Sequence, residues 1–115
     1  MKYLTLRTPN NKIDVMHANS WWLRLRGLLG RKLSADEAML IEPCNSVHTF
    51  WMKYNLDIVY INSDNEIVKI ITNMKPWSFS ACRRANKTLE LPANTANTIN
   101  LKKGDKMKFE KEVIR

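Results

Sequence analysis

The sequence contains little of what a flexible, membrane-spanning or secreted chain needs. Three glycines and four prolines among 115 residues give no sign of a hinge between two units. No stretch approaches the ~18–20 apolar residues that span a bilayer. Residues 1–7 also lack the continuous apolar run of a secretory signal. We therefore expect a single domain over residues 1–115 that has no membrane span and works in the cytoplasm.

The common short motifs of enzymes are also missing. The sequence has no Gly-rich phosphate loop, no G-x-S-x-G nucleophile elbow and no H-E-x-x-H zinc motif. Two cysteines and two histidines are few for a closed zinc site, which takes four protein ligands. These absences favour a protein that is not an enzyme and that holds no cofactor.

An excess of basic residues bears on the partners of the protein and not on its fold. Lys and Arg number 19 against 11 Asp and Glu, which gives a formal net charge of +8. A dedicated nucleic-acid protein usually gathers its cations on one stripe, whereas these cations are spread along the chain. No helix-turn-helix, zinc finger or RNA-recognition signature accompanies them. Weak nucleic-acid binding is therefore a minor alternative.

The hydrophobic pattern predicts several short strands and one main helix. Apolar and polar residues alternate in segments 3–7 and 13–17, as in half-buried strands. Two β-branched runs, 57–61 and 66–71, flank a short polar turn and predict a hairpin. Apolar residues recur at helical spacing in one segment only, at Trp21, Leu25, Leu28 and Leu29. We expect an α+β domain that is small and β-rich, with a curled antiparallel or mixed sheet or a barrel and one main helix, residues 20–30, against it.

Several blocks in one order carry a resemblance to a known family. Gly27-Leu28-Leu29-Gly30-Arg31 is followed by His48-Thr49-Phe50-Trp51-Met52-Lys53, and later by Leu89-Glu90-Leu91-Pro92-Ala93. With these blocks the chain resembles the domain of unknown function 192 family (DUF 192) from about residue 14 to residue 109. The segment Pro43-Cys44-Asn45-Ser46-Val47-His48-Thr49, paired with Cys82-Arg83, is similar to a cysteine-bearing subgroup. The resemblance implies a compact β-rich fold and supplies no agreed activity.

Cys44, His48 and Cys82 have the most specific chemistry in the sequence. Thiolate and imidazole ligands suit zinc or copper, and the Cys-x-x-x-His spacing can bring two ligands to one site. A Cys44–Cys82 disulfide is a second interpretation, since the loop that it closes is long enough for about 4 kcal/mol. Against it, cytosolic thiols stay reduced. Two reduced cysteines that pack as small hydrophobes are the simplest alternative, and a thiol made reactive by Arg83, Arg84 or His48 is another.

Lys53 and Asp57 are a second pair of candidate site residues. A carboxylate between the apolar neighbours of Asp57 is expected to be partly buried, so it needs a cation or several hydrogen-bond donors. Lys53, Arg24 and Arg31 are available cations. A structural ion pair is the favoured interpretation, and ligand binding or acid–base work is the alternative.

Segment 75–87 interleaves two aromatic residues with four cations. Aromatic faces stack on bases or sugars, and guanidinium groups pair with phosphates or carboxylates. Trp77, Arg83 and Arg84 are therefore candidate ligand-binding residues in a loop carried by a β-scaffold. The simpler alternative is that the aromatic residues cap one end of the core while the cations are solvated around them.

Together these observations predict a non-enzymatic binding or accessory domain. Its site would combine the Trp77–Arg84 loop with Cys44, His48 and Cys82 at one end of the scaffold. The expected partner is an anionic small molecule, a glycan or a protein. The alternative function is a metal- or thiol-redox site built on the same three residues, Cys44, His48 and Cys82.

Overall fold

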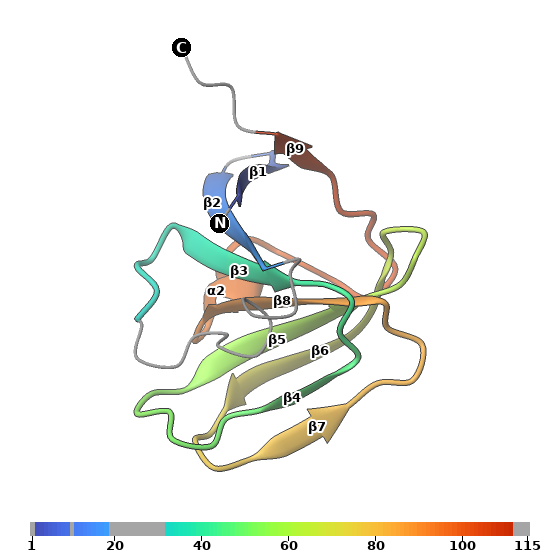
Figure 1. Cartoon of the computed structure of the whole chain (residues 1–115). Helices are drawn as coiled ribbons and strands as arrows, with labels where there is room; N and C mark the ends of the chain where they lie inside the picture. The colour runs from blue at the N-terminus through green and yellow to red at the C-terminus, as the bar shows by residue number, and fades with distance from the viewer. Residues whose placement is uncertain (1, 10, 19–31, 112–115) are drawn as a thin grey trace.

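The computed structural model describes residues 2–9, 11–18 and 32–111. In this part of the chain a seven-stranded sheet is accompanied by a two-stranded one (Figure 1). The elements in chain order are β1 (Lys2–Thr8), β2 (Asn11–Ala18), β3 (Glu37–Ile41), β4 (Ser46–His48), β5 (Leu56–Ile61), β6 (Ile67–Met74), β7 (Phe79–Ala81), β8 (Lys87–Pro92), α2 (Thr95–Thr98) and β9 (Phe109–Lys111).

The large sheet is mixed, and its order is β6-β5-β8-β3-β2-β1-β9. The pair β2–β3 is parallel, and the other neighbours are antiparallel. The α+β class and the mixed sheet expected from the sequence are thus confirmed, as is the β5–β6 hairpin, in which Val59 pairs with Ile70. The segment between the two strands, residues 62–66, forms the expected polar turn.

The sheet is not the closed barrel that was one of the two expectations. Among the described residues, β6 and β9 are the outer strands of the sheet and do not pair with each other. The start of β6 instead bonds to a loop, since Ile67 N–H donates to Asp105 O (2.9 Å) and Gly104 N–H donates to Ile67 O (2.8 Å). Between the described residues of this loop and the residue that precedes β6 there is an isolated bridge, Glu66 with Lys106. A closed barrel would need a continuous strand pair at that place.

Both faces of the sheet are covered, which explains why every residue of β5 is buried. Because side chains alternate along a strand, Val59 and Ile61 enter one apolar cluster while Ile58 and Tyr60 enter a second one on the other face. The first cluster includes Ala96 of α2, and the second includes Val47 of β4. The β4–β7 pair therefore lies over the second cluster.

Helices are few in the described part of the chain. The main helix expected at residues 20–30 lies outside the described residues. The short α2 was not expected from the sequence. Where the chain is described, no helix combines the length and the apolar character that a bilayer crossing requires.

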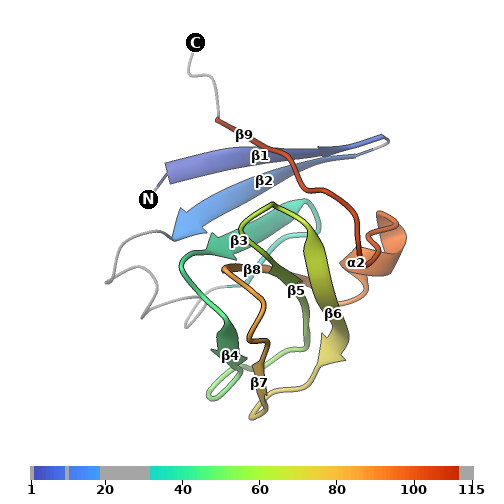
Figure 2. The ribbon, with the colours of Figure 1, turned by 90° about the vertical axis from the view of Figure 1, so that its right-hand side faces the viewer.

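The β4–β7 pair and the strands β1, β2 and β9 lie at opposite ends of the molecule (Figures 1 and 2). The β4–β7 pair and the loops beside it carry most of the residues singled out above: Cys44, His48, Lys53, Trp77, Cys82, Arg83 and Arg84.

Candidate functional site

Four rings, from the end of β4, the loop after it and the loop before β7, meet beside the β4–β7 pair. His48 packs against Phe50 with ring centroids 4.9 Å apart, and Phe50 stacks on Trp77 at 5.8 Å. Trp51 contacts Trp77 edge to face at 4.7 Å. We call these four side chains, His48, Phe50, Trp51 and Trp77, the aromatic cluster. It joins Trp77, which the sequence singled out for binding, to His48, which the sequence grouped with the thiols.

The cluster is exposed to solvent. Exposed fractions are 40% for Phe50, 68% for Trp51 and 58% for Trp77. Phe79 pairs with His48 across the β4–β7 ladder and is 67% exposed. Large aromatic side chains bury well over 100 Å² each when they pack, so this group is a concentrated apolar surface that the core does not use. The alternative that Trp77 and Phe79 cap the core is not what the structure shows.

Thr49 joins the loop after β4 to the loop before β7 by hydrogen bonds. It is 1% exposed, and its N–H donates to Ser78 O (2.9 Å) while its carbonyl accepts from Met52 N (3.1 Å) and Trp77 N (2.9 Å). The Thr49 hydroxyl donates to Lys75 O (2.6 Å) and accepts from Ser78 N–H (2.8 Å). A single buried residue therefore fixes the position of one loop relative to the other through both its backbone and its hydroxyl.

Both tryptophans have a backbone conformation that bulky residues rarely adopt. The φ angle is +70° at Trp51 and +60° at Trp77. Such left-handed conformations cost on the order of 1–3 kcal/mol and persist where surrounding bonds enforce them, often at binding sites. Strand β4 ends at His48 because the chain turns through Thr49 and Trp51.

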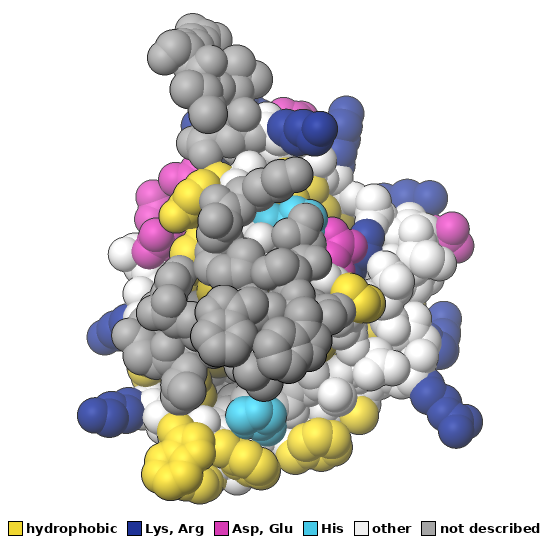
Figure 3. Space-filling view, in the orientation of Figure 1, with side chains coloured by type: hydrophobic (Ala, Val, Ile, Leu, Met, Phe, Trp, Pro, Cys, Tyr) yellow, Lys and Arg dark blue, Asp and Glu magenta, His cyan; other side chains and the backbone are white. Residues whose placement is uncertain are grey.

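The charge on the two segments that carry the cluster and the thiols is of one sign, with Lys53 and Lys75 near the rings and Arg83 and Arg84 at the other end of the β4–β7 ladder. Segments 44–56 and 72–86 contain Lys53, Lys75, Arg83 and Arg84, and their only carboxylate neighbour in sequence, Asp57, is fully buried. All four cations are exposed. In Figure 3, hydrophobic side chains gather along the lower edge of the molecule, with Lys or Arg side chains on both sides.

Lys87 does not belong to this group of cations. Its ammonium group lies 2.6 Å from Asn65 Oδ1 and 3.7 Å from Glu42 Oε2. It therefore contributes to packing between loops and is not a free cation of the binding segment.

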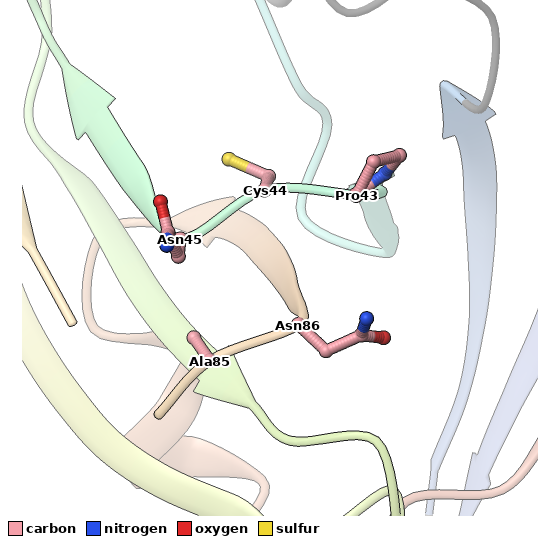
Figure 4. A pocket seen from close by; sticks show the side chains of 5 residues that line it. All are labelled: Pro43, Cys44, Asn45, Ala85 and Asn86. Carbon is pink, nitrogen blue, oxygen red and sulfur yellow. The ribbon is translucent and has the colours of Figure 1, made fainter. Parts of the chain in front are cut away.

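The two cysteines lie on neighbouring segments at the other end of the β4–β7 ladder. Cys82 N–H donates to Asn45 O (2.8 Å), and Cys44 N–H donates to Asn86 O (2.9 Å). Both thiols are free and half-buried. Cys44 Sγ donates to Ser46 O (3.0 Å). Figure 4 shows the open pocket of about 230 Å³ that Cys44 lines with Pro43, Asn45, Ala85 and Asn86.

Tyr60 lies close to both thiols. Burial raises the pKa of its hydroxyl, and the hydrogen bond to Ser80 Oγ (3.0 Å) acts in the opposite direction. Negative charge on Cys44 or Cys82 raises the Tyr60 pKa further. Both thiols also pack against the same apolar cluster as Tyr60.

His48 belongs with the aromatic rings rather than with the thiols. In the extended strand it stands four residues, roughly 13 Å of chain, from Cys44, and its ring contacts Phe50. Within residues 2–9, 11–18 and 32–111, no group of three His, Cys, Asp or Glu side chains is placed so that it could hold a metal ion. The three-ligand arrangement of Cys44, His48 and Cys82 is thus not formed in this structure.

Asp57 is satisfied by backbone donors and not by a described cation. Its Oδ1 accepts from Asn73 N–H (2.9 Å) and Asn94 N–H (3.0 Å), and its Oδ2 accepts from Ala96 N–H (2.9 Å). Lys53 is exposed, and none of the ion pairs within the described ranges includes Asp57. Of the three cations that the sequence offered to Asp57, Lys53 forms no ion pair with it within the described residues, where three N–H groups solvate the buried carboxylate. Arg24 and Arg31 lie outside the described residues, so an ion pair with either of them stays a prediction.

Glu90 is a buried acid that the sequence did not single out. It lies in β8 between Met39 of β3 and Ile58 of β5. In the described part of the chain its Oε2 has no hydrogen-bond partner. Burial raises the pKa of Glu90 to about 7. The signal in the sequence was a lone acid between Leu89 and Leu91, which is equally typical of a strand with one solvated face.

Comparisons with known proteins find relatives over nearly the whole chain. A protein of the UPF0127 group from Pyrococcus furiosus is 27% identical over 108 residues, which cover 89% of this chain and 91% of the relative. A UPF0127 protein from Pyrococcus horikoshii is 31% identical over 102 residues, covering 84% of this chain and 87% of the relative.

Two crystal structures have a similar fold. One is a candidate transcription regulator from Sinorhizobium meliloti, with a TM-score of 0.80, 24% identity and coverage of 94% of this chain and 92% of that one. The other is a protein of unknown function from Novosphingobium aromaticivorans, with a TM-score of 0.78, 20% identity and coverage of 92% and 83%. At these identities the likeness concerns the fold alone. The family model described as DUF192, Uncharacterized ACR, matches residues 4–109, and the chain belongs to that family.

Proposed function

We propose that the chain is a non-enzymatic binding domain whose binding surface combines the aromatic cluster with the Trp77–Arg84 loop. The observation that carries the proposal is the pair of exposed tryptophans, Trp51 and Trp77, which are held at positive φ and in contact with each other. Two strained indoles that are more than half exposed contribute little to the stability of the fold, so a role in binding is the best reason for them.

Arg83 and Arg84 extend this surface with charge. Both are exposed in the turn that follows β7, in which Ala85 N–H bonds back to Cys82 O (3.0 Å). Guanidinium groups pair with carboxylates and phosphates in fixed geometry. Partners that combine apolar and anionic groups therefore suit the surface, and they include anionic small molecules, acidic glycans and acidic protein segments.

Three probes of these classes test the proposal: citrate, heparin and a polyglutamate peptide. We expect at least one of them to bind, and the double variant Arg83→Ala/Arg84→Ala to bind it on the order of tenfold more weakly with an unchanged unfolding transition. A matched control is Lys102→Ala/Lys103→Ala, which removes two exposed cations from a loop outside the surface. If the double arginine variant binds every probe as the unchanged chain does, the assignment of the loop is wrong.

The second candidate function is a thiol-redox site, and the position of both cysteines on neighbouring segments, where Cys82 N–H donates to Asn45 O (2.8 Å), favours it. Oxidation by glutathione disulfide would join Cys44 to Cys82 with loss of two hydrogens, while the oxidant becomes two molecules of glutathione. Intact mass under denaturing conditions would show the loss of two hydrogens, and mass under native conditions would show any bound zinc or copper. An unchanged mass in both measurements would leave the cysteines as packing residues.

A further inference from the structure

We propose that the aromatic cluster and the cations beside it dock the protein on the surface of an anionic lipid bilayer. This inference rests on the proposed function, because it names one partner for the same surface. It concerns attachment to the headgroup region from one side and involves no segment that crosses the bilayer.

The apolar part of the surface suits the interfacial region of a membrane. Phe50, Trp51, Trp77 and Phe79 are all exposed, and they lie in the loops and strand ends beside the β4–β7 pair. Tryptophan and phenylalanine bury their rings at the boundary between headgroups and acyl chains, where the indole N–H still meets water. The Thr49 bonds already fix the two loops, so insertion requires no ordering of the backbone.

The charge complements that of an anionic leaflet. Lys53 and Lys75 lie within a few residues of the tryptophans, and Arg83 and Arg84 follow β7. Segments 44–56 and 72–86 contain no acidic residue that would be repelled. Figure 3 shows cationic side chains on both sides of the hydrophobic edge. A flat anionic surface that meets the rings can therefore also meet Lys53 and Lys75, which lie two residues from Trp51 and Trp77.

The packing of the rings favours lipid over single-stranded nucleic acid. Stacking of bases needs free ring faces, whereas Phe50 stacks on Trp77 at an interplanar angle of 26° and also packs against His48, tilted by 32°. Trp51 contacts Trp77 edge to face. The rings of the cluster thus pack on one another and do not present a row of free faces. An exposed apolar group of this kind partitions into the membrane interface.

Co-sedimentation of the full chain with vesicles tests the inference. Vesicles of phosphatidylcholine mixed with phosphatidylglycerol should bind the protein, and vesicles of phosphatidylcholine alone should bind it far more weakly. Trp51→Ala/Trp77→Ala should lower the partition coefficient roughly tenfold or more. Lys53→Gln and Lys75→Gln should each lower it about fivefold, the factor that corresponds to the ~1 kcal/mol contributed by one cation near the surface.

Two control variants test whether binding depends on this surface or only on the number of exposed aromatic and cationic side chains. Tyr3→Ala removes another exposed aromatic residue, on β1 at the opposite end, and Lys102→Gln/Lys103→Gln removes two cations elsewhere. Both should bind vesicles as the unchanged chain does. Each variant is compared by its thermal unfolding transition, and Trp51→Phe/Trp77→Phe, which keeps apolar rings, should recover much of the binding.

The outcomes distinguish this inference from the proposed function. Loss of binding in the tryptophan variant with retention in the Tyr3 variant supports docking on lipid. If vesicles are not bound but oligothymidylate or one of the anionic probes is bound through the tryptophans, the lipid partner is wrong and the binding surface stands. If vesicles bind equally to the unchanged chain and to the tryptophan variant, the docking inference is overturned.

Discussion

The Glu90 carboxyl lies between β3 and β5, and its Oε2 accepts no hydrogen bond within the described residues. Burial disfavours its charged form, which raises its pKa from 4.5 to about 7. The folded state therefore holds the proton more tightly than the unfolded state. Stability from this group is fully present below about pH 4.5 and is lost as the pH rises through 7.

Replacement of Glu90 by glutamine should remove that dependence. The unchanged chain should lose about 3 kcal/mol of unfolding free energy from this group between about pH 4.5 and 8. The unfolding free energy of Glu90→Gln should vary less over the same range, and at about pH 8 it should be higher than that of the unchanged chain. Urea unfolding across pH measures both. Glu110→Gln is the control, since Glu110 forms only a solvent-exposed ion pair with Arg7. Equal pH profiles for Glu90→Gln and the unchanged chain would show that Glu90 titrates normally.

At the scale of elements, Asp57 ties three parts of the chain together. It belongs to β5, and its carboxylate accepts N–H bonds from Asn73 in β6 and from Asn94 and Ala96 at the start of α2. Asn94 has φ +69°, which asparagine tolerates better than other non-glycine residues. The Asp57 carboxylate thus accepts hydrogen bonds from backbone N–H groups that would otherwise have no partner inside the protein.

Asp57→Asn should destabilise the fold, because an amide offers one acceptor oxygen where the carboxylate offers two. We expect a loss of about 2–4 kcal/mol in unfolding free energy, together with faster hydrogen exchange at Ala96. Asp64→Asn, in the exposed β5–β6 turn, should change neither quantity much. A loss in Asp57→Asn that is no larger than in Asp64→Asn would contradict the role assigned to these bonds.

The elements differ in how far the sequence predicted them. The β5–β6 hairpin follows from two β-branched runs around a polar turn, since local pattern and tertiary pairing agree there. Helix α2 could not be foreseen, because Thr95–Thr98 is a single turn in which Ala96 is the one good helix former, and Asp57 and the apolar cluster hold this turn in place. The end of β4 at His48 could not be predicted from the sequence either, because the hydrogen bonds of Thr49 to residues 75–78 are long-range contacts.

At the scale of the whole molecule, the candidate site is confined to one end. The sequence pointed to Trp77, Arg83 and Arg84 through their aromatic and cationic composition. It could not show that Trp77 contacts Trp51 and Phe50, because these pairs are brought together by the β4–β7 ladder and lie far apart in the chain. The strands β1, β2 and β9 form the opposite end (Figure 2).

The most direct test of the central claim is a residue-resolved NMR titration of the full chain with bicelles that contain phosphatidylglycerol. The account predicts that amide signals of residues 48–53 and 75–84 change first, while those of residues 2–8 and 109–111 change least. Changes centred on β1, β2 and β9, or a spectrum that the bicelles leave unaltered, would contradict it.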